Sequence, residues 1–430
     1  MLNDAKLIID NALKSAMPGN AVKKALAEMD LDSRSMDSKA VHTPAEERCG
    51  AAAVNRGSGE AAPSIVLIAA GKAAWEMANA AYAELSDKIS RGVVVTKYDH
   101  SKGPIGNLDI YEAGHPVPDE NSYRGTAAAL EAVKGAGKVL FLLSGGGSAL
   151  FEKPLLPASE MESITKALLA CGASIVEINT IRKRLSAVKG GRFANLCAPA
   201  HVYTVVLSDI IGDPLDMIAS GPAYPDSSTC EEAMEIIERY GINVSAEAAE
   251  LLKTETPKEL SNVTTFVTGS VKQLCKSAAE TAASLGYEPV FLTACLSCEA
   301  REAGRFLGAI AKDHAHDGKK LAYICGGETV VHLTGTGKGG RNQEIALAAA
   351  EEIRGLENVC VFSVGSDGTD GPTDAAGGIV TGATADALKA DIRKVLQDND
   401  AYNALKSVDA LIMTGPTGTN VNDLTAVLIG

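Results

Sequence analysis

The sequence predicts an α/β protein with two domains, and its length, composition and pattern of apolar runs all support this. With 430 residues the chain is too long for one ordinary core, and about 150 residues per domain suggests roughly two or three domains. It is 46% hydrophobic and 22% charged with 42 glycines, a composition typical of globular proteins and not of disordered chains. Short apolar runs alternate with longer amphipathic stretches, as buried parallel strands alternate with helices.

The expected elements follow in chain order. Residues 1–30 have apolar residues at helical spacing and predict a docking helix, without the basic start or apolar block of a signal peptide. Residues 31–63 lose this periodicity and predict a surface insertion. The polar, proline-bearing segment 243–262 predicts a boundary between an N-terminal domain, 1–242, and a C-terminal domain, 263–430. The strand-like runs are SIVLIAA, GVVVT, KVLFLLS, HVYTVVLS, TTFVTG, PVFLTAC, LAYICGG, NVCVFSVGS and ALIMTG.

Charge and cysteine usage exclude several classes of protein. The net charge is −14 and aromatic residues make up 4%, so the chain lacks the basic surface that nucleic acid requires. No apolar run reaches the ~18–20 residues that span a bilayer, so we expect a cytoplasmic protein with no membrane partner. The nine cysteines lie mostly alone in apolar segments, as reduced core thiols do.

Six of the predicted strands end in glycines, hydroxyl groups and acids. In open α/β sheets ligands bind at the carboxyl ends of the strands. These ends therefore predict a ligand site. They are Gly71-Lys72, Ser144 to Ser148, Asp209 with Asp213, Gly326 to Glu328, Asp367 with Asp370, and Thr414 to Asn420.

Three consecutive glycines, Gly145, Gly146 and Gly147, form the most unusual of these strand ends. One turn between a strand and a helix needs fewer glycines. Successive N–H groups of such a segment can converge on an anion, and the hydroxyl groups of Ser144 and Ser148 add donors. We predict an anion cradle here, with a plain tight turn as the alternative.

A second glycine-rich loop carries the pattern G-x-G-x-x-G at Gly335, Gly337 and Gly340. As a dinucleotide fingerprint the match is weak, because the acid expected about 20 residues further on is missing. Lys338 and Arg341 follow and offer cations to a phosphate or carboxylate group. A solvated helix start is the alternative interpretation.

Two charged stretches complete the candidate chemistry. The loop SDGTDGPTDAAGG concentrates Asp367, Asp370 and Asp374, which favours Mg²⁺, with a plain acidic loop as the alternative. A basic run precedes the strand HVYTVVLS and predicts mainly a solvated helix face, although it could attract an anionic substrate. The basic run consists of Arg182, Lys183, Arg184, Lys189 and Arg192.

Together these segments resemble the glycerate 2-kinase family, whose C-terminal domain is the MOFRL domain. The resemblance covers the chain from about residue 65 to the end. The sequence departs from the family pattern at 31–63 and at Glu152-Lys153, where the family tends to be apolar. The matching segments are AAGKAAWEMA, VTKYDHS, AGHPVPDENS, LLSGGGSALF, IRKRLSAVKGGRFA, LSDIIGDPLDMIASGPAYPD, GGETVVHLTGTGKGGRNQE, SDGTDGPTDAAGG and TGPTGTNVNDL.

The resemblance implies a kinase that uses ATP and Mg²⁺ to phosphorylate D-glycerate at its 2-hydroxyl, giving 2-phospho-D-glycerate and ADP. It implies a larger Rossmann-like N-terminal domain, a smaller α/β MOFRL domain and an active site in the cleft between them. The family's functional residues fall on Lys72, Arg341, Asp209 and Asp367. Magnesium ligands are expected at Asp209, Asp213 and Asp367. Substrate or nucleotide contacts are expected at Ser144, Gly145, Gly146, Gly147, Ser148, Glu328, Lys338, Asn342 and Thr417.

Two other functions compete with this one. An NAD(P)-dependent hydroxypyruvate reductase would need a His or Lys acid beside the nicotinamide, whereas the strand ends offer hydroxyl groups and aspartates. A non-catalytic sugar-acid binding protein would have little need for so many acids. The expected partners are glycerate and a nucleotide, with a homodimer as the candidate assembly; which acid is the base and which loop holds the nucleotide stay open.

Overall fold

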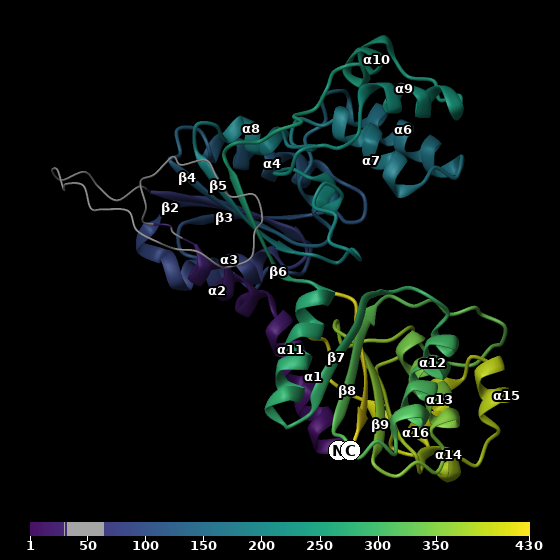
Figure 1. The fold of residues 1–430 in the computed structure, drawn as a ribbon. Coiled ribbons are helices and arrows are strands. Elements are labelled where there is room, and N and C mark those ends of the chain that lie inside the picture. The colour runs from purple at the N-terminus through teal and green to yellow at the C-terminus, as the bar shows by residue number, and fades with distance from the viewer. Residues whose placement is uncertain (30, 32–63) are drawn as a thin grey trace. The chain divides into compact units, whose positions relative to one another are not determined.

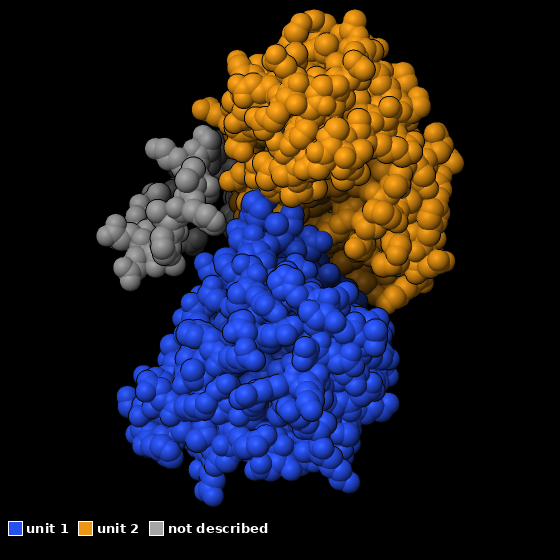
Figure 2. Space-filling model, turned by 90° about the vertical axis from the view of Figure 1, so that its right-hand side faces the viewer, with its two compact units in different colours: residues 1–21, 207–214, 267–430 blue, residues 22–206, 215–266 orange. Residues whose placement is uncertain are grey.

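The computed structural model describes residues 1–29, 31 and 64–430 (Figure 1). The predicted insertion at 31–63 lies, apart from Leu31, outside the described residues. The chain divides into two compact units (Figure 2). Unit 1 contains residues 1–21, 207–214 and 267–430, and unit 2 contains residues 22–206 and 215–266.

Unit 2 is built on a six-stranded sheet with the strand order β3-β2-β1-β4-β5-β6. Strands β1 to β5 pair in parallel, and every residue of β1 and β4 is buried. This is the Rossmann order, in which the chain reverses direction across the sheet between the first strand and its neighbour on the other side. The strands are β1 (Ile65–Ala70), β2 (Ile89–Lys97), β3 (Leu108–Ala113), β4 (Lys138–Leu143), β5 (His201–Leu207) and β6 (Val263–Gly269).

The helices of unit 2 form two groups. Helices α3 and α4 pack on the strands, while α6, α7, α9 and α10 pack on one another around a separate apolar cluster (Figure 1). Capping boxes start α4, α7 and α9, because each cap side chain satisfies a backbone N–H that has no partner inside the helix. The helices are α2 (Pro18–Glu28), α3 (Ala74–Leu85), α4 (Glu120–Ala132), α5 (Gly147–Leu150), α6 (Ala158–Ala170), α7 (Ile175–Arg184), α8 (Arg192–Cys197), α9 (Cys230–Arg239) and α10 (Ala246–Leu252), with short 3₁₀ turns η1 (Ser86–Lys88) and η2 (Ile218–Ser220).

The basic run is not the solvated helix face that the sequence predicts. Lys183, Arg184 and Lys189 are all buried. Lys183 Nζ lies 2.9 Å from Asp226 Oδ1, and Arg184 Nη1 lies 3.6 Å from Asp226 Oδ2. A sequence pattern shows that a helix carries charge, but it does not show which acid from a distant segment will cover it.

Unit 1 contains a second sheet of six strands, in the order β11-β10-β9-β12-β8-β7. Only β7 and β8 pair in parallel; β12 lies between β8 and β9 and is antiparallel to both. The all-parallel expectation is therefore wrong for this sheet, because strands buried on both faces have the same apolar pattern in either direction. The strands are β7 (Glu288–Leu296), β8 (Leu321–Gly327), β9 (Val359–Gly365), β10 (Gly377–Thr381), β11 (Leu411–Ile412) and β12 (Asp423–Ile429).

Helices cover both faces of this second sheet. Helices α1 (Leu2–Ala16) and α11 (Val271–Ser284) share one apolar cluster with alternate strand residues, and α12 (Ala300–His314) and α13 (Arg341–Glu352) share the other. The short helices α14 (Thr384–Ala387), α15 (Ile392–Gln397) and α16 (Ala401–Lys406) complete the unit. None of the described helices has the length and apolarity that a membrane-spanning segment needs.

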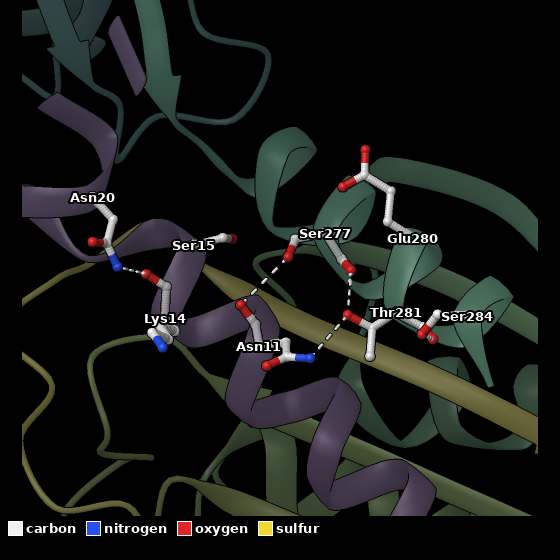
Figure 3. Close-up of a pocket in the computed structure, with 8 residues that line it drawn as sticks. All are labelled: Asn11, Lys14, Ser15, Asn20, Ser277, Glu280, Thr281 and Ser284. Carbon is white, nitrogen blue, oxygen red and sulfur yellow. Dashed lines mark hydrogen bonds between the residues drawn. The ribbon is translucent and has the colours of Figure 1, made fainter. Parts of the chain in front are cut away.

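The division into units differs from the sequence-based domains 1–242 and 263–430 at the N-terminus. Helix α1 docks as predicted, but it packs on α11 of unit 1, where Ile8 and Ala12 join the core with Leu274. Polar side chains of α1 and α11, with Asn20 of α2, line a pocket beside the two helices (Figure 3). There Asn11 Nδ2 donates to Thr281 Oγ1 at 3.4 Å. An amphipathic helix shows that it needs a partner, but not which domain supplies one.

We predict that Asp226→Ala destabilises the protein by about 3–5 kcal/mol, because it removes the buried carboxylate that Lys183 and Arg184 share and leaves them only the more exposed Asp216 and Glu255. Although burial would raise the pKa of Asp226, the ammonium of Lys183 holds it below its ordinary value. The contribution is therefore full above the ordinary aspartate pKa of about 3.9 and is lost as pH falls through the lower folded value. Urea denaturation at pH 7 measures it, with the exposed Glu238→Ala of α9 as control. A loss no larger than that of the control would contradict the prediction.

Candidate functional site

The loops after β1 and β4 are joined at the point where the sheet of unit 2 reverses its order. The backbone N–H of Lys72 donates to the carbonyl oxygen of Gly145 at 2.9 Å, and that of Ala73 donates to Ser144 Oγ at 3.1 Å. Gly71 has φ +125°, and a Cβ there would overlap the Ser144 hydroxyl. The structure thus brings Lys72 together with the predicted glycine cradle.

The glycine loop presents backbone donors. Gly146 has φ +84°, a conformation that glycine adopts readily. In the described part of the chain no acceptor is recorded for the N–H of Gly145 or Gly146, and both residues are half-buried. A Cβ at Gly146 would lie 3.1 Å from Lys72 Cγ and 3.0 Å from His115 Cδ2. Unused N–H groups between a lysine and a histidine fit an anion.

Cationic side chains gather around this loop in a protein of net negative charge. The pKa of His115 is lowered by burial and then by the charges of Lys72, Lys97 and His100. His100 Nδ1 also lies 2.9 Å from the carbonyl oxygen of Lys72. The local field therefore favours an anion and keeps the His115 imidazole neutral near pH 7.

The two predicted serine donors already have partners inside unit 2. Ser144 is buried, and its Oγ accepts the N–H of Ala73. Ser148 Oγ lies 3.2 Å from Ser220 Oγ, which donates to Asn179 Oδ1 at 3.0 Å. Both hydroxyl groups thus help to shape the loop, and their contact with a ligand stays a prediction.

In unit 1, hydrogen bonds to backbone carbonyl oxygens link the loops that carry the predicted acids. Asn422 Nδ2 donates to the carbonyl oxygen of Asp209 at 3.4 Å, and Ser366 N–H donates to that of Asn422 at 3.1 Å. The N–H of Thr417 donates to the carbonyl oxygen of Asp367 at 3.1 Å. The segment 207–214 therefore belongs with the C-terminal unit, although it follows a strand of the N-terminal sheet.

Arg341 is fixed by a two-point ion pair with Asp423. Arg341 Nε lies 2.5 Å from Asp423 Oδ2 and Nη2 lies 3.1 Å from Oδ1, while Nη1 lies 3.0 Å from Glu328 Oε1. Burial alone would lower the pKa of Arg341, but the hydrogen bonds and charge of Asp423 raise it. Asp423 is buried, whereas Arg341 and Glu328 are partly exposed. Asp423 thus holds the guanidinium in one orientation.

Of the three acids in the loop SDGTDGPTDAAGG, two are engaged in holding the protein together. Asp370 is buried and accepts the N–H groups of Asn342 at 3.1 Å and Gln343 at 2.9 Å at the start of α13. Burial raises the pKa of Asp370 to about 7. Asp374 accepts the hydroxyl of Tyr402 at 2.7 Å. Asp367 is half-buried, and its Oδ1 accepts the N–H of Thr369 in the same loop at 3.0 Å.

Asn342, predicted to bind a ligand, is buried in the same network. Its Oδ1 accepts the hydroxyl of Ser363 at 2.6 Å, and its Nδ2 lies 3.3 Å from Asp370 Oδ1. These contacts hold the start of α13, and with it the backbone of Arg341. Contact between Asn342 and a ligand stays a prediction.

In the second glycine-rich loop, the N–H groups of residues 335–338 have acceptors in the segment Asp398 to Asp400. The N–H of Gly335 donates to Asn399 Oδ1 at 3.0 Å, and the N–H of Lys338 donates to Asp400 Oδ1 at 2.9 Å. The N–H groups of residues 336 and 337 donate to Asp398. Lys338 Nζ lies 4.5 Å from the centre of the Tyr402 ring. The first four residues of the loop thus have no open donors for a dinucleotide pyrophosphate, whereas no acceptor is recorded among the described residues for the N–H groups of Gly339 and Gly340.

The residues predicted to hold Mg²⁺ are compatible with it, although they form no compact cluster. Asp213 has φ +51°, and its buried Oδ1 has no hydrogen-bond partner among the described residues. A magnesium ion needs only one or two carboxylates when waters and substrate phosphates supply its other ligands. Within the described residues, the group of three whose ligand atoms lie within 4.8 Å of one another is Cys230, Glu231 and Glu255. The Glu255 carboxylate there is already paired with Arg184 and Lys258.

Comparison with known proteins identifies the family to which the chain belongs. Residues 4–253 match the domain of unknown function DUF4147, and residues 321–423 match the MOFRL family. D-glycerate 2-kinase of Thermotoga maritima is 50% identical over 434 residues, which cover 98% of this chain and 97% of that protein. The chain belongs to the glycerate 2-kinase family.

Two further comparisons agree with this family. Glycerate 2-kinase of Pyrococcus horikoshii is 41% identical over 85% of this chain and 87% of its own length. A crystal structure of glycerate kinase from Thermotoga maritima has a TM-score of 0.88 at 49% identity and covers 100% of this chain and 99% of that chain. The predicted family and the α/β fold class are confirmed. The predicted active-site cleft between the domains stays a prediction, since each unit is described by itself.

Sequence reasoning missed three residues that shape these sites: Asp423, Asn422 and His115. Asp423 opens the apolar strand DLTAVLI, and an acid in such a run needs a buried partner. Asn422 has φ +64°, which asparagine tolerates better than most residues. Nothing in the local sequence places His115 beside Gly146, since that proximity comes from the folding of the loops after β3 and β4.

We predict that Gly146→Ala weakens ligand binding more than tenfold, equivalent to about 1.4 kcal/mol or more. The new methyl group would press on Lys72 and His115, and the positive φ would cost roughly 1–2 kcal/mol of stability. Titration calorimetry with ADP and with D-glycerate, beside a thermal melt, measures both effects. The control is Gly135→Ala, which has φ +69° and no atom within 4 Å of the added Cβ. Equal affinity in the two variants would show that the loop is only a turn.

Proposed function

We propose that this protein is an ATP-dependent kinase that phosphorylates D-glycerate at its 2-hydroxyl and requires Mg²⁺. The observation that carries the proposal is the open glycine cradle beside Lys72, in a chain that belongs to the glycerate 2-kinase family. Both substrates carry anionic oxygens, which such a cradle can accept. A cytoplasmic location and a homodimeric assembly stay predictions.

Phosphoryl transfer depends mainly on positioning and on stabilising charge on the transferred group. In unit 2, the ammonium of Lys72 and the N–H groups of Gly145 and Gly146 bind anionic oxygens of a phosphate or of the glycerate carboxylate. In unit 1, Arg341 is held by Asp423, so that its guanidinium neutralises phosphate charge without reorienting. The proposal thus assigns catalytic residues to both units.

The acids of unit 1 have two roles to fill. Asp209, Asp213 and Asp367 are the proposed magnesium ligands, and Mg²⁺ would neutralise charge on the nucleotide phosphates when bound. Asp209 or Asp367 would accept the proton of the attacking hydroxyl. Glu328, Lys338 and Thr417 are proposed to contact substrate or nucleotide.

The structure gives no support to the hydroxypyruvate reductase alternative. Its main sequence signal was the G-x-G-x-x-G loop, and the N–H groups of residues 335–338 in that loop are occupied by the segment Asp398 to Asp400. The non-catalytic binding protein differs from the kinase only in turnover. One assay therefore separates all three.

The purified protein with ATP, MgCl₂ and D-glycerate is expected to release ADP, and phosphorus NMR is expected to show 2-phosphoglycerate. Hydroxypyruvate with NADH or NADPH should show no oxidation of the cofactor. Formation of the 3-phosphate alone would overturn the regiochemistry. Cofactor oxidation without ADP release would favour the reductase, and binding of glycerate without either reaction would favour the binding protein.

We predict that Asp367→Asn lowers kcat by a factor on the order of 10²–10³, because it removes a charge from the reacting centre. Raised Mg²⁺ distinguishes the two roles: partial rescue indicates a metal ligand, and no rescue indicates the base. Asp374→Asn in the same loop is the control, since that carboxylate already accepts the Tyr402 hydroxyl. Turnover of Asp367→Asn equal to that of the control would remove Asp367 from both roles.

A further inference from the structure

Two cations of the basic run meet the glycine loop from inside unit 2. The carbonyl oxygen of Ser148 accepts from Lys189 Nζ at 2.8 Å and from Arg182 Nη2 at 3.1 Å. Lys189 also donates to the carbonyl oxygen of Phe151 at 3.1 Å. The segment that follows the three glycines is thus held by charged donors.

A buried acid fixes these cations in turn. Glu152 is 1% exposed, and its Oε1 accepts the hydroxyl of Ser186 at 2.5 Å. Its Oε2 lies 3.3 Å from Lys189 Nζ and 3.8 Å from Arg182 Nη2. Because one acid pairs with two cations, an excess positive charge remains beside the segment that follows the three glycines.

One turn of backbone connects Ser148 to the glycine cradle at Gly145 to Gly147. The N–H groups of Ala149 and Leu150 both donate to the carbonyl oxygen of Gly146 at 3.2 Å. These two bonds fix the Gly146 carbonyl to the first turn of α5. A displaced Ser148 carbonyl would move this turn and with it the donors of Gly145 and Gly146.

We propose that Lys189, assisted by Arg182, is a positioning residue for phosphoryl transfer: it holds the glycine loop in the conformation that binds an anion. The inference rests on the proposed kinase function for its catalytic consequence, but not for its effect on binding. Lys189 is completely buried and reaches the ligand only through the loop. Its role is therefore distinct from that of Lys72, which borders the cradle directly.

The ionisation of Lys189 gives this role a signature that packing alone would not have. Burial lowers the pKa of Lys189 to about 8, Glu152 partly offsets this, and Arg182 lowers it further. These are the charged groups that face Lys189. Because a lysine in an unfolded chain has a pKa of about 10.4, the unfolded chain binds more protons than the folded one between pH 8 and 10. The titration of Lys189 therefore raises the free energy of unfolding, and does not lower it, as pH rises over this range.

The test uses a charge-balanced pair of substitutions, Lys189→Met with Glu152→Gln, since Lys189→Met alone would strand a buried acid. We expect a folded protein whose kcat/KM is lowered on the order of 10²-fold, as misplaced binding groups commonly cause. Binding of ADP or D-glycerate in titration calorimetry should weaken at least tenfold. The matched control is Lys183→Met with Asp226→Asn, a buried pair in the same run with no recorded bond to the loop.

A pH profile adds a second readout. The wild type is expected to lose kcat/KM above about pH 8 with its melting temperature maintained, and Lys189→Arg should move this limb to higher pH because a guanidinium does not titrate there. Wild-type binding and turnover in the folded double variant would overturn the inference, as would an alkaline limb unchanged in Lys189→Arg. If the wild type binds ADP or D-glycerate but transfers no phosphate, the kinase proposal fails and the binding measurements still decide the role of Lys189.

Discussion

The parallel pairing of β1 with β4 is the constraint on which the candidate site of unit 2 depends. These two strands are neighbours in the sheet although about 70 residues separate them in sequence, and their register ends at Ala70 opposite Leu143. The loops that follow must therefore leave the sheet side by side. Gly71 permits the close approach, and the bond from Lys72 N–H to the Gly145 carbonyl joins the two loops. Lys72 therefore lies next to the backbone N–H donors of the glycine loop, although about 70 residues separate them in the sequence.

Buried charge pairs hold the cations of both units in place. Arg341 is fixed by Asp423, Lys189 by Glu152, and Arg184 by Asp226. Such pairs are costly to desolvate and add little to stability compared with apolar packing. What they provide is a fixed direction, because a guanidinium bound at two points cannot rotate without leaving a buried carboxylate unpaired. This fixed direction offsets the desolvation cost in a kinase, because phosphate charge is then neutralised without reorganising the side chains.

The two glycine-rich loops show how similar sequences acquire different uses. At Gly145 to Gly147, the backbone carbonyls accept hydrogen bonds, and two N–H groups have no acceptor among the residues that the structure describes. In the second loop, the segment Asp398 to Asp400 accepts the N–H groups of residues 335–338, and Gly335 and Gly337 are needed because that segment approaches too closely for a Cβ. The G-x-G-x-x-G pattern alone does not distinguish these cases, since it records the absence of side chains and not what fills the space.

The sequence by itself determined the local features: the α/β class, the family, five of the six strands of the first sheet (β3 was missed), and glycine and lysine at strand ends. These follow from apolar periodicity and from short motifs, in which the relevant residues are near one another along the chain. Only the tertiary structure decided the direction of β12, the docking of α1 on unit 1, the placement of the Asp209 loop in that unit and the burial of Lys183, Arg184 and Lys189. Each of these depends on a partner from a distant segment, as Asp226 for Lys183 or Asp423 for Arg341. A pattern within one segment reports that a charge or an apolar face needs a partner, but the identity of that partner is set by the packing of the whole chain.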